Sequence, residues 1–283
     1  MAATPQTPPE PQVVQIELTP DELATKKMGS HHLQSAVEAL HRDGMVVLTN
    51  AVDPAHLDKL NERMVPEAKE LYSRATTHRN FGDETGNIQQ EPVLEAGYVF
   101  ADVLANPWAT ETIQCLHGPP AAAHRHRLRL PPVPFGYCVN INLVATSPAN
   151  GATEVWLGSH TDTTQDVLET DPATGHRQIR ADLQEARRRI GRPPVQPSLP
   201  KGALIIRDFR LWHAGMPNRT DEPRVMLVSV QFPSWYRSDL KMKLPASIKD
   251  KVEWGDVIPC AEWMPDGYDY LKGAHDHDFT LLP

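Results

Sequence analysis

Apolar residues at helical spacing predict helices in the first third of the chain. Residues 19–22, TPDE, form a capping box with proline at the first helical position, so a helix is expected to begin there. The apolar stripe over residues 33–40 ends at Gly44, and glycine commonly terminates helices. A further helix should open at Asp53, and its apolar face consists of Leu57, Leu60, Met64, Ala68 and Leu71.

Alternation of apolar and polar residues predicts strands in the rest of the chain. A short strand is expected over residues 45–50, and a longer series over residues 137–144, 152–158, 202–209 and 224–232. Residues 73–118 read as irregular. Residues 161–200 are expected to form a long connection between strands that contains one helix. The apolar stripe of this helix is Ile179, Leu183, Ala186 and Ile190. Helices followed by strands with long connections favour a mostly β fold with helical decoration and a β-sandwich or jelly-roll core.

Composition narrows the class of protein. The chain of 283 residues has a net charge of −8, which provides no basic surface for nucleic acid or anionic lipid. No apolar run approaches the roughly 18 residues of a membrane span, and the N-terminus lacks the order of a signal peptide. Cys115, Cys138 and Cys260 match no metal or disulfide spacing, so we expect a reduced, cytoplasmic protein. Residues 1–15 are proline-rich and read as a disordered tail, followed by a single domain over residues 16–283.

Two side chains on the strands are candidates for chemistry. Arg224 shares the parity of Met226 and Val228 on a strand whose apolar face should point inward. A buried guanidinium needs an anionic partner, which is either an internal carboxylate or a bound carboxylate ligand. His213 lies eleven residues earlier, and a hairpin between them would bring the two side chains together; alternatively, His213 is an ordinary core histidine.

Four motifs carry a resemblance to a known family. They are NGATEVWLGSH (150–160), PKGALIIRDFRLWHAGMPNRTDEPRVML (200–227), HRDGMVVLTNAVDPAHLDKL (41–60) and NIQQEPVLEAGYVFADVLANPWA (87–109). Together they resemble the phytanoyl-CoA dioxygenase family, in particular its fungal secondary-metabolism branch, over most of residues 33–240. The resemblance implies a double-stranded β-helix that uses Fe(II) and 2-oxoglutarate, with O₂, on a small organic substrate.

The resemblance also implies roles for single residues. His213 matches the distal histidine that holds the iron, and Arg224 matches the arginine that grips the far carboxylate of 2-oxoglutarate. Thr153 is expected near this cosubstrate, and His160 near the site without being a ligand. A homodimer, or a heterodimer with an active relative, is compatible with the family.

The family's His-X-Asp metal motif is altered in this chain. His124 takes the place of its histidine and His126 that of its aspartate. Three interpretations stay open. His124, His126 and His213 form an all-histidine metal site, which imidazole chemistry allows. Alternatively, the site is lost and the protein is a non-catalytic partner or scaffolding subunit. In the third, residues 117–130 are an artefact of gene prediction.

Overall fold

The computed structural model describes most of the chain outside its two ends. The described residues are 11–77, 79, 85–117, 134–163, 165–170, 172, 177–236 and 241–272. Residues 11–15 contact the body of the protein: the backbone N–H of Val47 donates to the carbonyl of Val14, and Gln15 begins the first strand.

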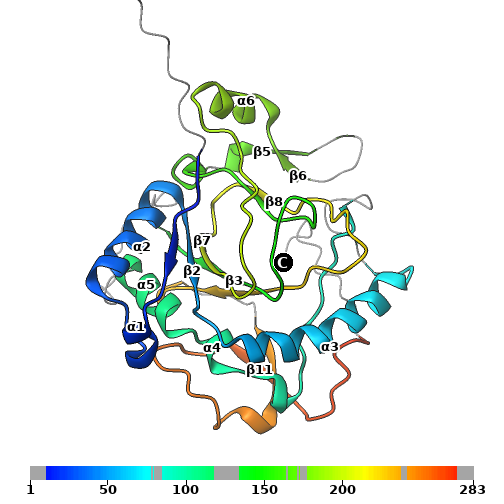
Figure 1. The fold of residues 1–283 in the computed structure, drawn as a ribbon. Coiled ribbons are helices and arrows are strands. Elements are labelled where there is room, and N and C mark those ends of the chain that lie inside the picture. The colour runs from blue at the N-terminus through cyan, green and yellow to red at the C-terminus, as the bar shows by residue number, and fades with distance from the viewer. Residues whose placement is uncertain are drawn as a thin grey trace, which may run out of the picture.

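A five-stranded mixed sheet forms the centre of the fold (Figure 1). Its strands lie in the order β1 (Gln15–Glu17), β2 (Met45–Thr49), β7 (Leu204–Asp208), β3 (Tyr137–Asn142) and β9 (Met226–Gln231). β1 is parallel to β2, and every other neighbouring pair is antiparallel. Three two-stranded pairs complete the described strands: β4 (Glu154–Val155) with β8 (His213–Ala214), β5 (Leu168–Thr170) with β6 (Arg177–Ile179), and β10 (Met242–Pro245) with β11 (Ala261–Met264).

Helices surround this sheet. They are α1 (Pro20–Thr25), α2 (Ser30–Asp43), α3 (Pro54–Ser73), α4 (Ala101–Leu104), α5 (Pro107–His117) and α6 (Ala181–Arg189). Figure 1 shows α1, α2 and α5 to the left of the sheet, α3 and α4 below it, and α6 above it with β5 and β6. Helices occupy more of the described residues than strands do, so the fold is a mixed sheet with helices and the expectation of a mostly β chain holds only in part.

The two faces of the sheet have different partners. Side chains directly opposite each other on paired strands point to the same face. Val139 of β3 pairs with Ile206 of β7, and this face packs on α2, α3 and α5 in the largest hydrophobic core. Cys138 and Asn140 belong to the opposite face, which looks toward β4 and β8. The alternation along β3 therefore directs Val139 toward the helices, and Cys138 and Asn140 toward β4 and β8.

The N-terminal helices begin and end where local sequence predicts. Thr19 caps α1 with the complete capping box, and Asp53 caps α3 through the backbone N–H of Ala55. Gly44 ends α2 at a φ of 76°, in the left-handed region that glycine adopts freely. The whole predicted apolar face of α3 is buried. Local propensity and packing agree in this region.

Elsewhere the tertiary structure corrects three predictions. Residues 107–117 form helix α5, although the segment 73–118 read as irregular. The apolar stripe predicted for the helix in residues 161–200 is not buried as a unit: Ile190 is 68% exposed and lies outside α6, Ala186 is exposed and Ile179 lies in β6. The helix instead buries Arg187 and partly buries Leu183. The strand predicted over residues 152–158 is paired only at Glu154–Val155.

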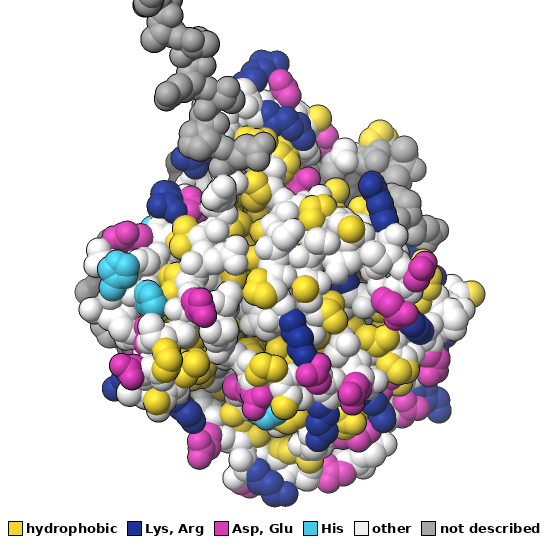
Figure 2. All heavy atoms as spheres, viewed as in Figure 1, with side chains coloured by type: hydrophobic (Ala, Val, Ile, Leu, Met, Phe, Trp, Pro, Cys, Tyr) yellow, Lys and Arg dark blue, Asp and Glu magenta, His cyan; other side chains and the backbone are white. Residues whose placement is uncertain are grey.

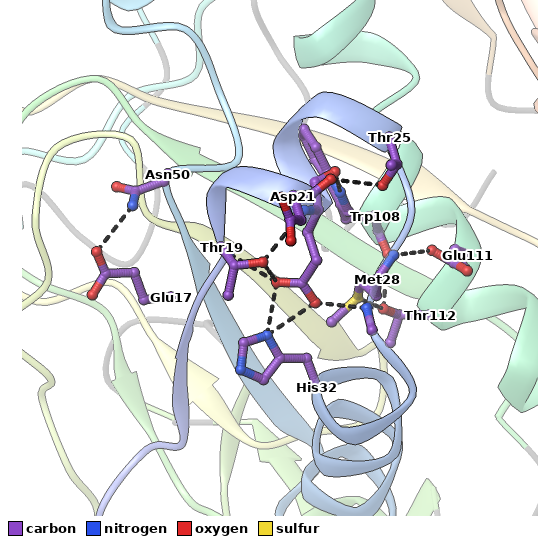
Figure 3. Close-up of polar contacts among 12 residues, drawn as sticks. Glu17, Thr19, Asp21, Thr25, Met28, His32, Asn50, Trp108, Glu111 and Thr112 are labelled. Carbon is purple, nitrogen blue, oxygen red and sulfur yellow. Dashed lines mark hydrogen bonds and ion pairs between the residues drawn. The ribbon is translucent and has the colours of Figure 1, made fainter.

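The buried carboxylate of Glu22 links α1 to the start of α2. It accepts hydrogen bonds from the backbone N–H and hydroxyl of Thr19, from the backbone N–H of Gly29 and from Nδ1 of His32, at 2.6–3.0 Å. Figure 3 shows Thr19 and His32 within this network, with Met28 beside them, whose backbone N–H donates to Glu111 of α5. Burial opposes ionisation of Glu22, but these donors outweigh it and lower the pKa to about 2.

The surface shows no segregation of charge on the face drawn in Figure 2. Lys and Arg side chains are interspersed there with Asp and Glu, and apolar side chains are scattered between them. Among the described residues, no helix combines the length and the apolar character needed to cross a membrane.

Candidate active site

A large cavity opens on the face of the sheet that the helices leave uncovered. Its wall includes Cys138 and Asn140 of β3, Ile205 and Arg207 of β7, and Val230 of β9. Segments around β4 and β8 also line it. The two layers thus enclose a space into which polar side chains from several strands project, the usual form of a small-molecule site.

His213 lies on β8 and is exposed to this cavity. Its Nδ1 is 2.8 Å from the carbonyl oxygen of Leu211 and 3.1 Å from a guanidinium nitrogen of Arg207. The carbonyl can only accept, whereas the guanidinium can only donate, so the two contacts make opposite demands on Nδ1. The shorter contact, to Leu211, favours the tautomer in which Nδ1 carries the proton and donates it. Nε2 then holds the free lone pair. Desolvation of the ring inside the cavity, reinforced by the positive charge of Arg207, lowers the pKa of His213 to about 3, so the ring is neutral at physiological pH. A neutral imidazole held through Nδ1–H by a carbonyl is the usual state of a metal-binding histidine.

The same geometry corrects the sequence-based picture of this histidine. β7 ends at Asp208, and His213 belongs to a separate strand pair in which it lies opposite Val155 of β4. It is therefore not an ordinary core residue at the end of the central sheet. The turn between the two strands moves the imidazole across to the far wall of the cavity.

Arg224 lies just before β9 and also lines the cavity. Its Nε donates to the carbonyl oxygen of Asn150 at 3.2 Å, and within the described part of the chain no carboxylate pairs with it. Burial lowers the pKa of its guanidinium. By contrast, the partly buried Arg210 is paired with Asp208 at 2.8 Å. The internal salt bridge considered for Arg224 is thus not found among the residues described.

Arg207 is a cavity residue that the sequence interpretation missed. It is only 7% exposed, it lies opposite Cys138 on β3, and its guanidinium contacts His213. None of the ion pairs formed by described residues includes it. The signal was present in the sequence, since Arg207 alternates with Asp208 and shares the inward parity of Ile205. Two cationic side chains in one cavity therefore lack an anionic partner in the described chain.

Three of the five predicted site residues line the cavity. Thr153, one residue before β4, lines it together with His213 and Arg224. His124 and His126 lie outside the described residues. Within the described ranges, no three His, Cys, Asp or Glu side chains are close enough to hold a metal ion by themselves. The described part thus offers one imidazole ligand, and the other two candidates stay predictions.

His160 is a structural residue beside the end of α2. It is buried, its Nε2 lies 3.2 Å from the carbonyl oxygen of His41, and it is absent from the cavity lining. Its ring packs against Gly44 so closely that a Cβ there would lie 2.5 Å from Nδ1. His160 thus packs beside the helix end at Gly44, and the expectation that it lies near the site without binding metal stays a prediction.

With this geometry in place, similarity to known proteins can be added. Residues 108–226 match the model of the phytanoyl-CoA dioxygenase (PhyH) family. This match confirms the resemblance to the family over these residues, and the fungal branch stays a prediction. The PhyH match spans Thr153, His213 and Arg224 as well as His124 and His126.

Two solved structures are similar to this PhyH-like chain. AviO1 from Streptomyces viridochromogenes Tue57 is 19% identical, with a TM-score of 0.45, over 73% of this chain and 98% of that chain. EvdMO1 is 22% identical, with a TM-score of 0.44, over 71% of this chain and 50% of that chain. The alignment thus covers about half the length of EvdMO1.

Proposed function

We propose that this protein is an Fe(II)- and 2-oxoglutarate-dependent dioxygenase-type oxidoreductase that acts on a small organic molecule. The proposal includes a double-stranded β-helix core, a role in secondary metabolism as in the fungal branch of the family, and a cytoplasmic location as a homodimer or a heterodimer with an active relative. It is supported by the PhyH match and by the cavity between the sheet and the β4–β8 pair.

The observation that carries the proposal is the state of Arg224. Its guanidinium lies in the wall of the cavity, is desolvated, and has no carboxylate partner among the described side chains. A group in this state can bind an anion that is not part of the chain. The Nε bond to Asn150 fixes one side of the group, and among the described atoms its terminal nitrogens contact only the sulfur of Met226, at 3.9 Å, a weak acceptor that a carboxylate can replace. The far carboxylate of 2-oxoglutarate has the planar geometry that this fork accepts.

The metal would be held by His213 from the described part of the chain. Its Nε2 lone pair is available because Nδ1–H is bound to Leu211. His124 and His126 are the proposed further ligands, and they lie outside the described residues. When bound, iron supplies the oxidising chemistry in which 2-oxoglutarate is decarboxylated to succinate and CO₂ and the organic substrate is oxidised by O₂.

Side chains of the protein itself bind and orient the cosubstrate. Arg224 binds and orients the cosubstrate, and Thr153 offers a hydroxyl near it on the β4 side of the cavity. Met226 contacts the guanidinium of Arg224 through its sulfur at 3.9 Å and supplies apolar surface beside the proposed carboxylate position.

The test measures 2-oxoglutarate binding to anaerobic, Fe(II)-loaded protein by calorimetry and by the visible absorption band of an iron–keto acid complex. Arg224→Gln should weaken 2-oxoglutarate binding by about two orders of magnitude, because it removes a charge-assisted, bidentate contact worth about 3 kcal/mol. Arg219→Gln is the matched control, since Arg219 is exposed and outside the cavity lining. Wild-type protein that binds neither iron nor 2-oxoglutarate would refute the proposal.

A further inference from the structure

One end of the cavity is built from aromatic rings. Phe135, Phe209, Phe232, Trp235 and Tyr236 form a connected cluster, here called the aromatic wall. Phe232 stacks on Tyr236 with ring centroids 4.8 Å apart, and the other contacts in the wall are tilted or edge-to-face at 5.3–6.4 Å. The rings come from three separate segments, so only the folded chain assembles them.

The aromatic wall leaves an unusual amount of ring surface uncovered. Phe209 is 43% exposed, Trp235 is 52% exposed and Tyr236 is 37% exposed, and all three line the cavity. Phe232 is held in place from behind, because a Cβ on Gly136 would lie 2.8 Å from its ring. Large apolar side chains exposed together at a cavity favour a ligand that covers them, and fixed rings favour a flat one.

Arg207 lies next to the aromatic wall. Phe209 follows it by two residues, and the backbone N–H of Phe209 donates to the carbonyl of Gly136, which aligns the wall with the end of β3. Arg207 itself is buried and has no carboxylate partner in the described chain. A buried guanidinium of this kind is stabilised by an anion. Asn140 on the same face of β3 adds a buried amide oxygen without a hydrogen-bond partner among the described atoms.

Arg207 and Arg224 hold separate positions on the sheet. Arg207 lies on β7, level with Cys138 and Val230, whereas Arg224 lies just before β9, six residues before Val230 and on the other side of β3. The two cations are therefore suited to two different anions, and the one at Arg207 is adjacent to the rings.

We propose that the substrate of this cavity is an aromatic carboxylic acid, with its ring system against the aromatic wall and its carboxylate on Arg207. This inference deepens the proposed function, because it assigns the substrate class of the same site. It requires no metal for binding, so it can be tested separately from the oxidation chemistry.

The test compares three probes by calorimetry on metal-free protein: 2-naphthoate, its neutral counterpart 2-naphthamide, and cyclohexanecarboxylate. We expect 2-naphthoate to bind at least about tenfold more tightly than either of the others, since each lacks one of the two contacts. Equal affinity for the naphthoate and the naphthamide, or no binding of the naphthoate to wild-type protein, would overturn the proposal.

Single substitutions test which side chains contact the carboxylate and the ring of the probe. Arg207→Gln should weaken 2-naphthoate binding by about tenfold without changing 2-naphthamide binding, and Arg207→Lys should restore part of it. Trp235→Ala should weaken both naphthalene probes, and its exposed position makes misfolding a small concern. Saturating 2-oxoglutarate should leave naphthoate binding unchanged. If Arg224→Gln abolishes naphthoate binding and Arg207→Gln does not, the acid is bound at the other cation and the assignment is wrong.

Discussion

The buried carboxylate of Glu22 gives the most quantitative prediction. It accepts hydrogen bonds from Thr19 and His32, both labelled in Figure 3, and from the backbone N–H of Gly29. It is only 6% exposed. Its pKa falls from 4.5 to about 2 on folding. A shift of that size corresponds to about 3 kcal/mol of folding free energy at neutral pH.

The sign follows from linkage. A carboxylate whose folded pKa is depressed contributes stability that is fully present above its unfolded pKa of 4.5 and is lost as the pH falls through the folded value of about 2. Near pH 3 the folded protein still holds the charge while most unfolded chains have taken up a proton, so about 1 kcal/mol of the contribution remains.

The perturbation is Glu22→Gln, which keeps the size of the side chain and leaves one acceptor oxygen among several donors. The assay is urea unfolding of the variant and of wild type at pH 7 and pH 3. We expect the variant to be less stable by about 3 kcal/mol at pH 7 and by only about 1 kcal/mol at pH 3. Titrating groups that do not contact Glu22 cancel, because they are the same in both proteins.

The control is Glu38→Gln, a change at an exposed residue whose carboxylate accepts only from Gln34 on the same helix. It should change the stability by less than about 0.5 kcal/mol at either pH. If Glu22→Gln destabilises the protein equally at pH 7 and pH 3, the loss is one of packing and the reasoning from the pKa is refuted.

Three further variants test the site and the core. Arg224→Met should stabilise the ligand-free protein by about 1 kcal/mol while it removes 2-oxoglutarate binding, because an unpaired desolvated charge is replaced by an apolar group; a loss of urea stability would contradict this. Gly44→Ala should lower stability by about 1–3 kcal/mol more than Gly255→Ala, since both glycines have positive φ but only Gly44 presses on His160; equal thermal shifts would exclude that contact as the cause. Leu57→Ala should cost about 2–5 kcal/mol, because the side chain is fully buried, and a smaller change in chemical denaturation would indicate that the core collapses around it.

Much of the candidate site could be predicted from the sequence, because a charged residue at an inward-facing position interrupts the apolar face of a strand. Arg224 is a cation on an apolar strand face, and His213 lies in a motif that resembles a known family. Thr153 follows from the same resemblance. Arg207 carried the same signal as Arg224, but the strand that contains it ends one residue later, and the alternation there was too short to decide which face it occupies.

The sequence by itself determined the features that depend on neighbours along the chain. Caps at Thr19 and Asp53, the glycine end of α2 and the apolar face of α3 each rest on interactions within a few residues, so local pattern was sufficient. The signal for α5 was also local, because Asn106 caps it through the backbone N–H of Ala109.

Only the tertiary structure decided where side chains from distant segments meet. The turn after Asp208 moves His213 to the far wall and sets its ring 3.1 Å from Arg207. The rings of the aromatic wall come together because β3, β7 and β9 pair in one register, which places Phe209 and Phe232 around Gly136. Such contacts depend on strand order and on which face of the sheet the helices cover. These are properties of how the whole chain buries its apolar surface, and no local stretch of sequence specifies them.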